Sequence, residues 1–125
     1  MDNAISIRNN IAKTYREAIS KIKGLTFLSP PDDVKLNYSY FPIFINEKEF
    51  GMSRDELYFK LKENNILSRR YFYPLITDFS FYENHPNIVK HDLKTSKQIS
   101  SNVICLPIHH NITQRDISFI IGVLI

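Results

Sequence analysis

The sequence predicts a single α+β domain: a small, mainly antiparallel sheet of about three strands with helices packed on one face. Three observations lead to this prediction. The chain has 125 residues, which is the size of one domain. Helical segments alternate along it with three short segments rich in β-branched and aromatic residues. These strand-like segments are too few, and the helical segments too unevenly spaced, for a doubly wound parallel sheet.

The longest helical segment opens the chain. Apolar side chains recur at three- and four-residue steps between residues 3 and 23, and charged side chains fill the other face. Gly24 is expected to supply the left-handed residue that ends this helix. A helix this long at the start of a small domain is expected to pack partly on something outside the domain. The apolar positions are Ile5, Ala12, Tyr15, Ala18, Ile19 and Ile22.

Two later helices have clear start signals. Ser53 with Glu56, and Thr113 with Asp116, have capping-box spacing, in which the two side chains satisfy each other's free backbone amides. The helix after Ser53 is predicted to end at residues 64–65, where two asparagines tolerate the left-handed conformation. The helix after Thr113 runs to the end of the chain.

The remaining segments are short. Residues 46–51 are expected to form a turn and residues 76–91 to be irregular, because turn-forming residues are frequent in both. A short helix is predicted for residues 92–101, with Asp92 as its N-cap. Pro42 places its strand at an edge or a bulge, since proline has no amide to donate. The predicted strands are residues 38–45, 69–73 and 102–108.

Composition excludes several classes of protein. The net charge is +3 and no run of Lys and Arg exceeds two residues, so nucleic-acid binding is not expected. No apolar window is long enough for a membrane span and no secretion signal opens the chain. Cys105 is the one cysteine, which excludes an internal disulfide, and its apolar neighbours indicate a buried, inert thiol. A reduced, cytoplasmic protein is expected.

Motifs for cofactor or metal chemistry are missing. None of the three glycines stands in a phosphate-binding pattern, and no lysine has surroundings typical of a Schiff-base amine. His109 and His110 are adjacent and without further ligands at metal-binding spacing, so a solvated turn is favoured over a metal site. The sequence therefore predicts no catalytic residue, no cofactor-binding residue and no metal ligand within the chain.

One stretch concentrates cations and aromatic rings. Arg69 and Arg70 run directly into Tyr71, Phe72 and Tyr73. This stretch is either a strand of an ordinary core or one wall of a site for an anionic, ring-containing ligand. Side chains alternate along a strand, so Arg69, Tyr71 and Tyr73 are predicted on one face and Arg70 and Phe72 on the other. Tyrosines in such a strand are also often core residues with exposed hydroxyls.

Four stretches, in this order and at this spacing, carry a resemblance to a known family. They read "YREAISKIKGLTFLSPPDDVKLNYSYFPIFI", "SRDELYFKLKENNI", "SRRYFYPL" and "SSNVICLPIHHNITQRDISFII". The first resembles the linking helix, "GL" turn, proline loop and first strand of the C-terminal small domain in the DegT/DnrJ/StrS family of pyridoxal-phosphate-dependent sugar-nucleotide aminotransferases. The others resemble the next helix, an arginine-plus-"YFYP" signature of members acting on nucleotide-linked deoxy-sugars, and the closing strand and helix. Residues 1–24 then correspond to the linking helix.

The resemblance implies a function. Family members are homodimers that transfer an amino group, typically from glutamate, to a keto-sugar nucleotide. The small domain covers one side of the active site, and the substrate-binding positions that match are Arg69, Arg70, Tyr71 and Tyr73. Arg69 fits the family's arginine best by its spacing from Ile66. Its guanidinium suits either the donor carboxylate or a phosphate of the sugar nucleotide.

The resemblance also implies a missing part. In the family a large N-terminal domain carries the Schiff-base lysine and most contacts to pyridoxal phosphate, and no positions of this chain match it. The chain alone is therefore expected to be an inactive fragment that binds no cofactor and whose partner is that large domain. We expect apolar surface to be exposed on the first helix and in residues 76–91. The alternative is a stand-alone, non-catalytic protein-interaction module.

Overall fold

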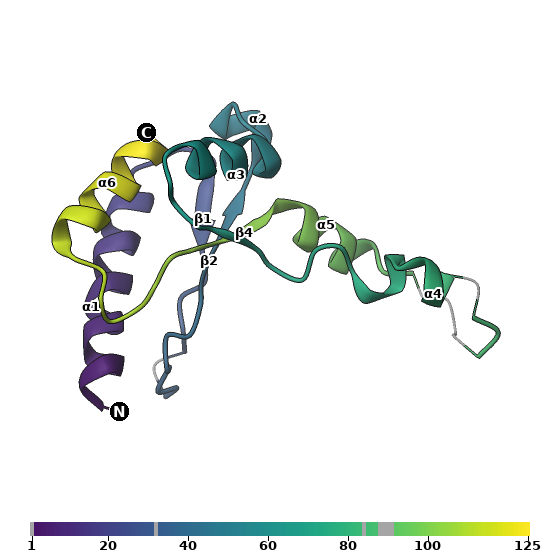
Figure 1. Cartoon of the computed structure of the whole chain (residues 1–125), viewed down its shortest axis with the longest axis horizontal. Helices are drawn as coiled ribbons and strands as arrows, with labels where there is room; N and C mark the ends of the chain where they lie inside the picture. Colours follow the sequence, from purple (N-terminus) through teal and green to yellow (C-terminus); the bar gives the residue numbers. More distant parts are fainter. Residues whose placement is uncertain (1, 32, 84, 88–91) are drawn as a thin grey trace.

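A computed structural model describes residues 2–31, 33–83, 85–87 and 92–125 and confirms the α+β architecture (Figure 1). Helices and strands are interspersed along the chain, and the start of α1 and the end of α6 lie at opposite ends of a helix pair beside the sheet. The elements are α1 Asp2–Ile19, β1 Leu25–Phe27, β2 Phe41–Ile45, α2 Glu47–Phe50, α3 Arg54–Glu63, β3 Arg69–Arg70, the 3-10 helix η1 Ile76–Asp78, α4 Ser80–Glu83, α5 Lys94–Asn102, β4 Val103–Leu106 and α6 Gln114–Leu124.

The sheet of the described residues has four strands in the order β1-β2-β4-β3, and every neighbouring pair is antiparallel. The prediction of a small antiparallel sheet is confirmed. The additional strand is β1, which is three residues long and pairs with β2. The first predicted strand starts at Phe41 rather than at residue 38, because Tyr38 has a φ of +53°, outside the extended region.

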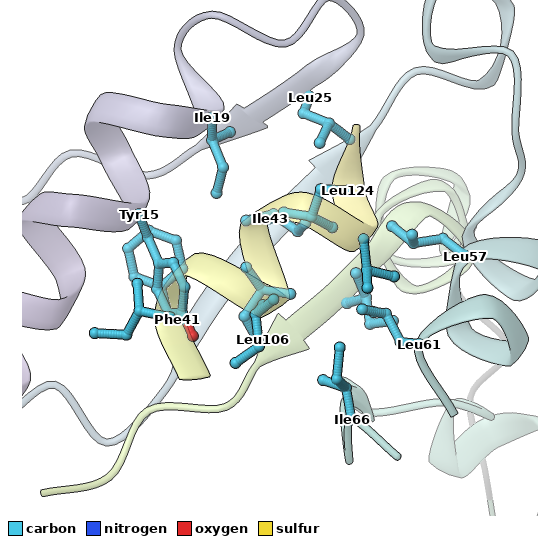
Figure 2. Packing of buried hydrophobic residues seen from close by; sticks show 14 of the residues in the cluster. Tyr15, Ile19, Leu25, Phe41, Ile43, Leu57, Leu61, Ile66, Leu106 and Leu124 are labelled. Carbon is cyan, nitrogen blue, oxygen red and sulfur yellow. The ribbon is translucent and has the colours of Figure 1, made fainter. Parts of the chain in front are cut away.

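The hydrophobic core lies between one face of this sheet and helices α1, α3 and α6. Alternate residues of β2 point into it, and all three are buried: Phe41, Ile43 and Ile45. Figure 2 shows Tyr15 and Ile19 of α1, Leu57 and Leu61 of α3 and Leu124 of α6 gathered around Ile43. The prediction that helices pack on one face is therefore confirmed. The opposite face, which carries Pro42 and Phe44, is called the open face below.

The first helix is shorter than predicted. It ends at Ile19, and residues 20–24 form turns that lead into β1. Gly24 has the predicted left-handed conformation, with a φ of +81°, but it serves the turn before β1 rather than the helix end. The amide of Asn46 donates to its carbonyl over 2.8 Å, and a Cβ on Gly24 would lie 2.3 Å from the backbone nitrogen of Phe50. The close approach of α2 therefore requires glycine here.

Both predicted capping boxes are present. The Ser53 amide donates to Glu56 Oε2 over 2.7 Å, and the Glu56 amide donates back to the Ser53 hydroxyl over 3.3 Å. Thr113 and Asp116 repeat this arrangement at the start of α6. The pKa of the Glu56 carboxyl is lowered by the backbone amide of Ser53, and that of Asp116 by the Thr113 hydroxyl, because these bonds favour the charged form.

Other local predictions need correction. Residues 46–51 contain the single turn of α2, and the described part of 76–91 contains η1 and α4, while residues 84 and 88–91 lie outside the described residues. Helix α5 begins at Lys94 with Leu93 at its N-cap, and Asp92 instead accepts a hydrogen bond from the Lys94 amide over 3.2 Å. None of the described helices is both long and apolar enough to cross a bilayer.

Candidate functional site

The two adjacent arginines of β3 serve opposite faces of the sheet. Arg69 pairs with Cys105 of β4 and Arg70 pairs with Ile104. Residues directly opposite each other in an antiparallel ladder point to the same side. Ile104 belongs to the core beneath the helices, so Arg70 lies on the helix-covered face and Arg69 on the open face. Placement of Arg69 and Arg70 on opposite faces agrees with the strand alternation.

The alternation does not continue to Tyr73. Strand β3 has only two residues, and Phe72 has a φ of +48°, so the chain turns out of the sheet directly after Arg70. Tyr73 lies beside Arg70, with its ring centre 5.2 Å from the guanidinium carbon. The prediction that Tyr73 shares a face with Arg69 is therefore wrong. Tyr71 packs instead on Tyr40, with 5.2 Å between ring centres.

A shallow groove of about 420 Å³ surrounds Arg69 on the open face, and it is called the Arg69 groove here. Arg69 is exposed, is the one charged residue of its lining, and takes part in none of the ion pairs among the described residues. Ser39 and Tyr40, which both carry a hydroxyl group, belong to the same lining, and the Tyr71 ring packs on that of Tyr40. The full lining is Ser39, Tyr40, Leu67, Arg69, Cys105, Leu106, Pro107 and Ile108.

Cys105 forms part of the floor of this groove but is not a nucleophile. Its side chain is buried, and burial raises the pKa of the thiol to about 11, although the nearby Arg69 charge acts in the opposite direction. A thiol with that pKa is protonated at neutral pH, and only the thiolate is reactive. The predicted inert thiol agrees with this environment.

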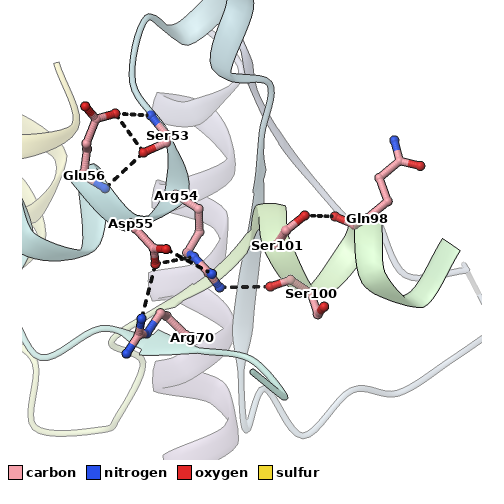
Figure 3. A network of polar contacts seen from close by, with 8 residues as sticks. All are labelled: Ser53, Arg54, Asp55, Glu56, Arg70, Gln98, Ser100 and Ser101. Carbon is pink, nitrogen blue, oxygen red and sulfur yellow. Dashed lines mark hydrogen bonds and ion pairs between the residues drawn. The ribbon is translucent and has the colours of Figure 1, made fainter. Parts of the chain in front are cut away.

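On the other face, Arg70 belongs to a cluster with Arg54 and Asp55 (Figure 3). Arg54 is buried, and its Nη1 donates to the carbonyl of Ser100 over 2.9 Å. Its Nε lies 2.8 Å from Asp55 Oδ1 as an ion pair without hydrogen-bond alignment, and Arg70 Nη1 approaches the same oxygen to 3.3 Å. One carboxylate thus balances two guanidinium groups that come from α3 and β3.

Aromatic rings complete this arginine cluster. The Arg54 guanidinium carbon lies 4.2 Å from the centre of the Tyr73 ring, and that of Arg70 lies 4.7 Å from the centre of the Tyr58 ring. Cation–π contacts of this kind contribute about 0.5–2 kcal/mol each. The cluster therefore ties Tyr73 and the end of α5, through Ser100, to the start of α3.

Sequence reasoning did not find Arg54 or Asp55. A signal was available, because Arg54 is the first residue of α3, where the helix dipole disfavours a cation. A buried arginine at that position needs specific partners, and Asp55, Ser100 and Tyr73 are those partners. The side chain of Arg70 remains one-third exposed, with 35% of its surface accessible.

Another groove on the open face, of about 1050 Å³, lies between α2 and α5. It contains none of the four predicted site residues, and its charged residues, Glu47 and Lys48, have opposite signs. We place the candidate site at the smaller Arg69 groove, since a cation without an ion-pair partner among the described residues is a defined feature for binding an anion. No group of three His, Cys, Asp or Glu side chains that could hold a metal occurs in the described part of the chain.

Comparison with known proteins identifies relatives over the whole chain. The model of the DegT/DnrJ/EryC1/StrS aminotransferase family matches residues 1–124. A dTDP-4-amino-4,6-dideoxy-D-glucose transaminase of Shigella dysenteriae is 38% identical over 122 residues, and one of Escherichia coli is 37% identical over 115 residues. These matches cover 98% and 92% of this chain but only 32% and 31% of the relatives.

Solved structures share the fold. The aminotransferase TlmJ from Streptoalloteichus hindustanus superposes with a TM-score of 0.84 at 20% identity, covering 99% of this chain and 31% of TlmJ. DesI, solved with its TDP-sugar product, superposes with a TM-score of 0.87 at 23% identity, covering 97% of this chain and 30% of DesI. The chain thus spans about a third of the length of the proteins it matches.

Proposed function

Because the chain belongs to the DegT/DnrJ/EryC1/StrS aminotransferase family, we propose that it forms one wall of the active site of a sugar-nucleotide aminotransferase. The assembled enzyme transfers an amino group, typically from glutamate, to a keto-sugar nucleotide. The transaminases of Shigella dysenteriae and Escherichia coli, whose names specify a dTDP-linked amino-sugar, support this substrate class.

The observation that carries the proposal is the Arg69 groove. Arg69 is an exposed cation without an ion-pair partner among the described residues, and the hydroxyl-bearing residues Ser39 and Tyr40 belong to the same lining. An arginine can donate two parallel hydrogen bonds to a phosphate or a carboxylate. The hydroxyls of Ser39 and Tyr40 can form hydrogen bonds with the hydroxyls of a sugar ring. The Tyr71 ring packs on the Tyr40 ring and helps to hold it in place.

Arg70 and Tyr73 have a different place in this proposal. Both belong to the arginine cluster on the other face, where Arg70 is already paired with Asp55. We propose that Arg70 and Tyr73 hold the segment after β3 in place, and that Arg69 makes the direct contact with the anion. Substitution of Arg70 is then expected to act on the fold before it acts on substrate affinity.

Pyridoxal phosphate, the cofactor of the family, does not fit the described residues of this chain. The cofactor needs an amine in a desolvated pocket to form its covalent link with the protein. No lysine in the described part of the chain is buried, and none lines the Arg69 groove. We therefore propose that the cofactor is held by the part of the relatives' fold outside these 125 residues, and that this chain alone is inactive.

The role of Arg69 can be tested in a chimera. The matched 122-residue segment of the Shigella transaminase is replaced by this chain, and initial rates are measured against both substrates. Arg69→Ala removes charge-assisted hydrogen bonds of about 1.5–3 kcal/mol, so one substrate's KM should rise about 10- to 100-fold. A rise for the sugar nucleotide identifies a phosphate contact, and a rise for the amino donor identifies a carboxylate contact.

Arg115→Ala is the matched control. Arg115 is also an exposed arginine, but it lies on α6, away from the groove lining. The Arg115→Ala substitution should leave both KM values within about twofold of those of the unsubstituted chimera. If Arg69→Ala changes neither KM more than Arg115→Ala does, the assignment of Arg69 to substrate binding is wrong.

The expected inactivity of the isolated chain has a spectroscopic test. The purified chain is mixed with pyridoxal phosphate, absorbance is recorded in the aldimine band, and borohydride is added to trap any adduct. Scattered, non-saturating modification of surface lysines is expected. A saturable adduct on one lysine would show that the chain holds the cofactor by itself.

A further inference from the structure

The segment after β3 projects from the body of the molecule as an apolar arm, defined here as residues 71–82. Figure 1 shows η1 and α4 of this arm, together with α5, extending to the right of the sheet and away from the α1–α6 side. Its large apolar side chains are exposed by 39% to 74%. These are Phe72, Tyr73, Ile76, Phe79, Phe81 and Tyr82.

The apolar area on the arm is large for an exposed surface. Aromatic residues present about 150–250 Å² each, so these fractions amount to an area on the order of 600 Å². That is the upper end for the largest apolar patch of a typical monomer. Asp78 is the only charged residue between positions 71 and 82. The sequence-based expectation of exposed apolar surface in this region is confirmed for the described residues.

The arm also has a cavity of its own. A hollow of about 250 Å³ lies between its first half and the start of α5, and its lining includes Phe72, Ile76 and Leu93. Apart from the hydroxyls of Thr77 and Ser96, this lining consists of apolar residues. A hollow of this kind accepts one apolar side chain from a partner surface.

The base of the arm is fixed, which distinguishes it from a loose loop. Tyr73 lies over the guanidinium of buried Arg54 at 4.2 Å and beside that of Arg70 at 5.2 Å. Arg54 also holds the Ser100 carbonyl in α5, the helix that lines the hollow. A surface that is already positioned loses less conformational entropy when it binds.

From these features we infer that the apolar arm is a docking surface for the large domain of the family's full-length fold. The chain covers only 32% of the Shigella relative, so about two-thirds of that fold lies outside it. Interfaces between domains of one chain bury roughly 600–1,500 Å², which matches the area of the arm. The arm also begins at Tyr71 and Phe72, whose rings lie 4.2 Å apart, and Tyr71 supports the Arg69 groove through Tyr40.

This inference rests on the proposed function, because it takes the opposite wall of the Arg69 groove to come from the same large domain. A second copy of this chain is the competing occupant, and the test separates the two. The double variant Ile76→Ser/Phe81→Ser removes two of the most exposed apolar side chains of the arm. Phe119→Ser is the matched control, since Phe119 is 53% exposed on α6, outside the arm.

Hydrogen exchange of the amides of residues 72–82 is compared between the isolated chain and the Shigella chimera. Exchange should slow at least tenfold in the chimera, return to the rate of the isolated chain in Ile76→Ser/Phe81→Ser, and stay slow in Phe119→Ser. Equal exchange in the isolated chain and the chimera overturns the inference. A second copy of the chain is the occupant if hydrogen exchange in the arm of the isolated chain slows with rising concentration and light scattering shows a dimer that the double variant abolishes. That result also overturns the inference.

A second arrangement does not depend on a soluble chimera. The chain is co-expressed with the remaining two-thirds of the Shigella relative as a separate polypeptide, and co-purification is measured. The Ile76→Ser/Phe81→Ser variant should abolish co-purification, and the Phe119→Ser variant should not. If both variants lose co-purification, or if neither does, the inference is overturned. Arg69→Ala should leave the slow hydrogen exchange of the arm and the co-purification unchanged, while it weakens substrate binding. Failure of the proposed substrate site and failure of the docking surface therefore give different results.

Discussion

Removal of the shared carboxylate in the arginine cluster should destabilise the chain strongly. Asp55→Asn leaves Arg54, whose side chain is 2% exposed, without its counter-charge and leaves the Arg70 guanidinium beside it. Breaking a buried ion pair from one side costs about 3–5 kcal/mol. Asp55 itself is 45% exposed, so water screens part of the interaction, and we expect a loss of about 2–3 kcal/mol in the free energy of unfolding.

Urea unfolding followed by circular dichroism measures this loss. With a slope of about 1–3 kcal/mol per molar urea, a loss of about 2–3 kcal/mol should lower the midpoint by about 0.7–3 M. The control is Asp92→Asn, because the Asp92–Lys94 pair spans 3.1 Å with side chains 66% and 88% exposed. Such surface pairs contribute about 0–1 kcal/mol, so the control midpoint should barely move.

A double-mutant cycle tests the cause. In an Arg54→Met background no buried cation remains, so Asp55→Asn should cost little more than it does at the surface. The reasoning is refuted if the loss in the free energy of unfolding caused by Asp55→Asn lies within about 0.5 kcal/mol of the loss caused by Asp92→Asn. It is also refuted if the loss caused by Asp55→Asn is the same in the Arg54→Met background.

Three further predictions concern single positions. The pKa of Asp116 is lowered, so its stabilising effect is complete above the ordinary carboxyl pKa and is lost as pH falls through the lowered one. Asp116→Asn should therefore flatten the fall in the free energy of unfolding as the pH drops below about 4, the ordinary carboxyl pKa, and an equally steep fall in the variant would contradict this. Cys105 should react with a thiol reagent at pH 8 only after urea is added, because burial raises its pKa to about 11; rapid labelling of the folded chain would show otherwise. Gly24→Ala should lower the thermal midpoint through its positive φ and its contact with α2, whereas Gly122→Ala, in α6 with open space around it, should stabilise by about 0.5–1 kcal/mol. Equal effects at the two glycines would refute the steric account.

Local signals in the sequence predicted the starts of two helices well. The capping boxes at Ser53 and Thr113 fix the starts of α3 and α6 because donor and acceptor lie three residues apart in the same chain segment. Strand β1 escaped prediction because three residues are too few to show a period of two. Its formation depends on pairing with β2, which lies about twenty residues further along the chain.

The candidate site shows a similar division. Opposite faces for Arg69 and Arg70 follow from strand alternation alone, and the β4 pairing agrees. The position of Tyr73 does not follow, because Phe72 adopts a positive φ that phenylalanine rarely takes and that residue type does not signal. The partners of Arg54 depend on how α3 meets β3 and α5, which only the tertiary structure determines.

The short ladder of β3 has a consequence for tolerance of insertions and deletions. Two paired residues hold the strand to β4, and a shift of one residue would exchange the sides to which the arginines point. The ion pair between Arg70 and Asp55 opposes that shift, because it forms only when Arg70 faces α3. The Arg70–Asp55 ion pair therefore helps to fix the register of β3 on β4. A length change of one residue before Arg69 should be tolerated only where another cation then pairs with Asp55.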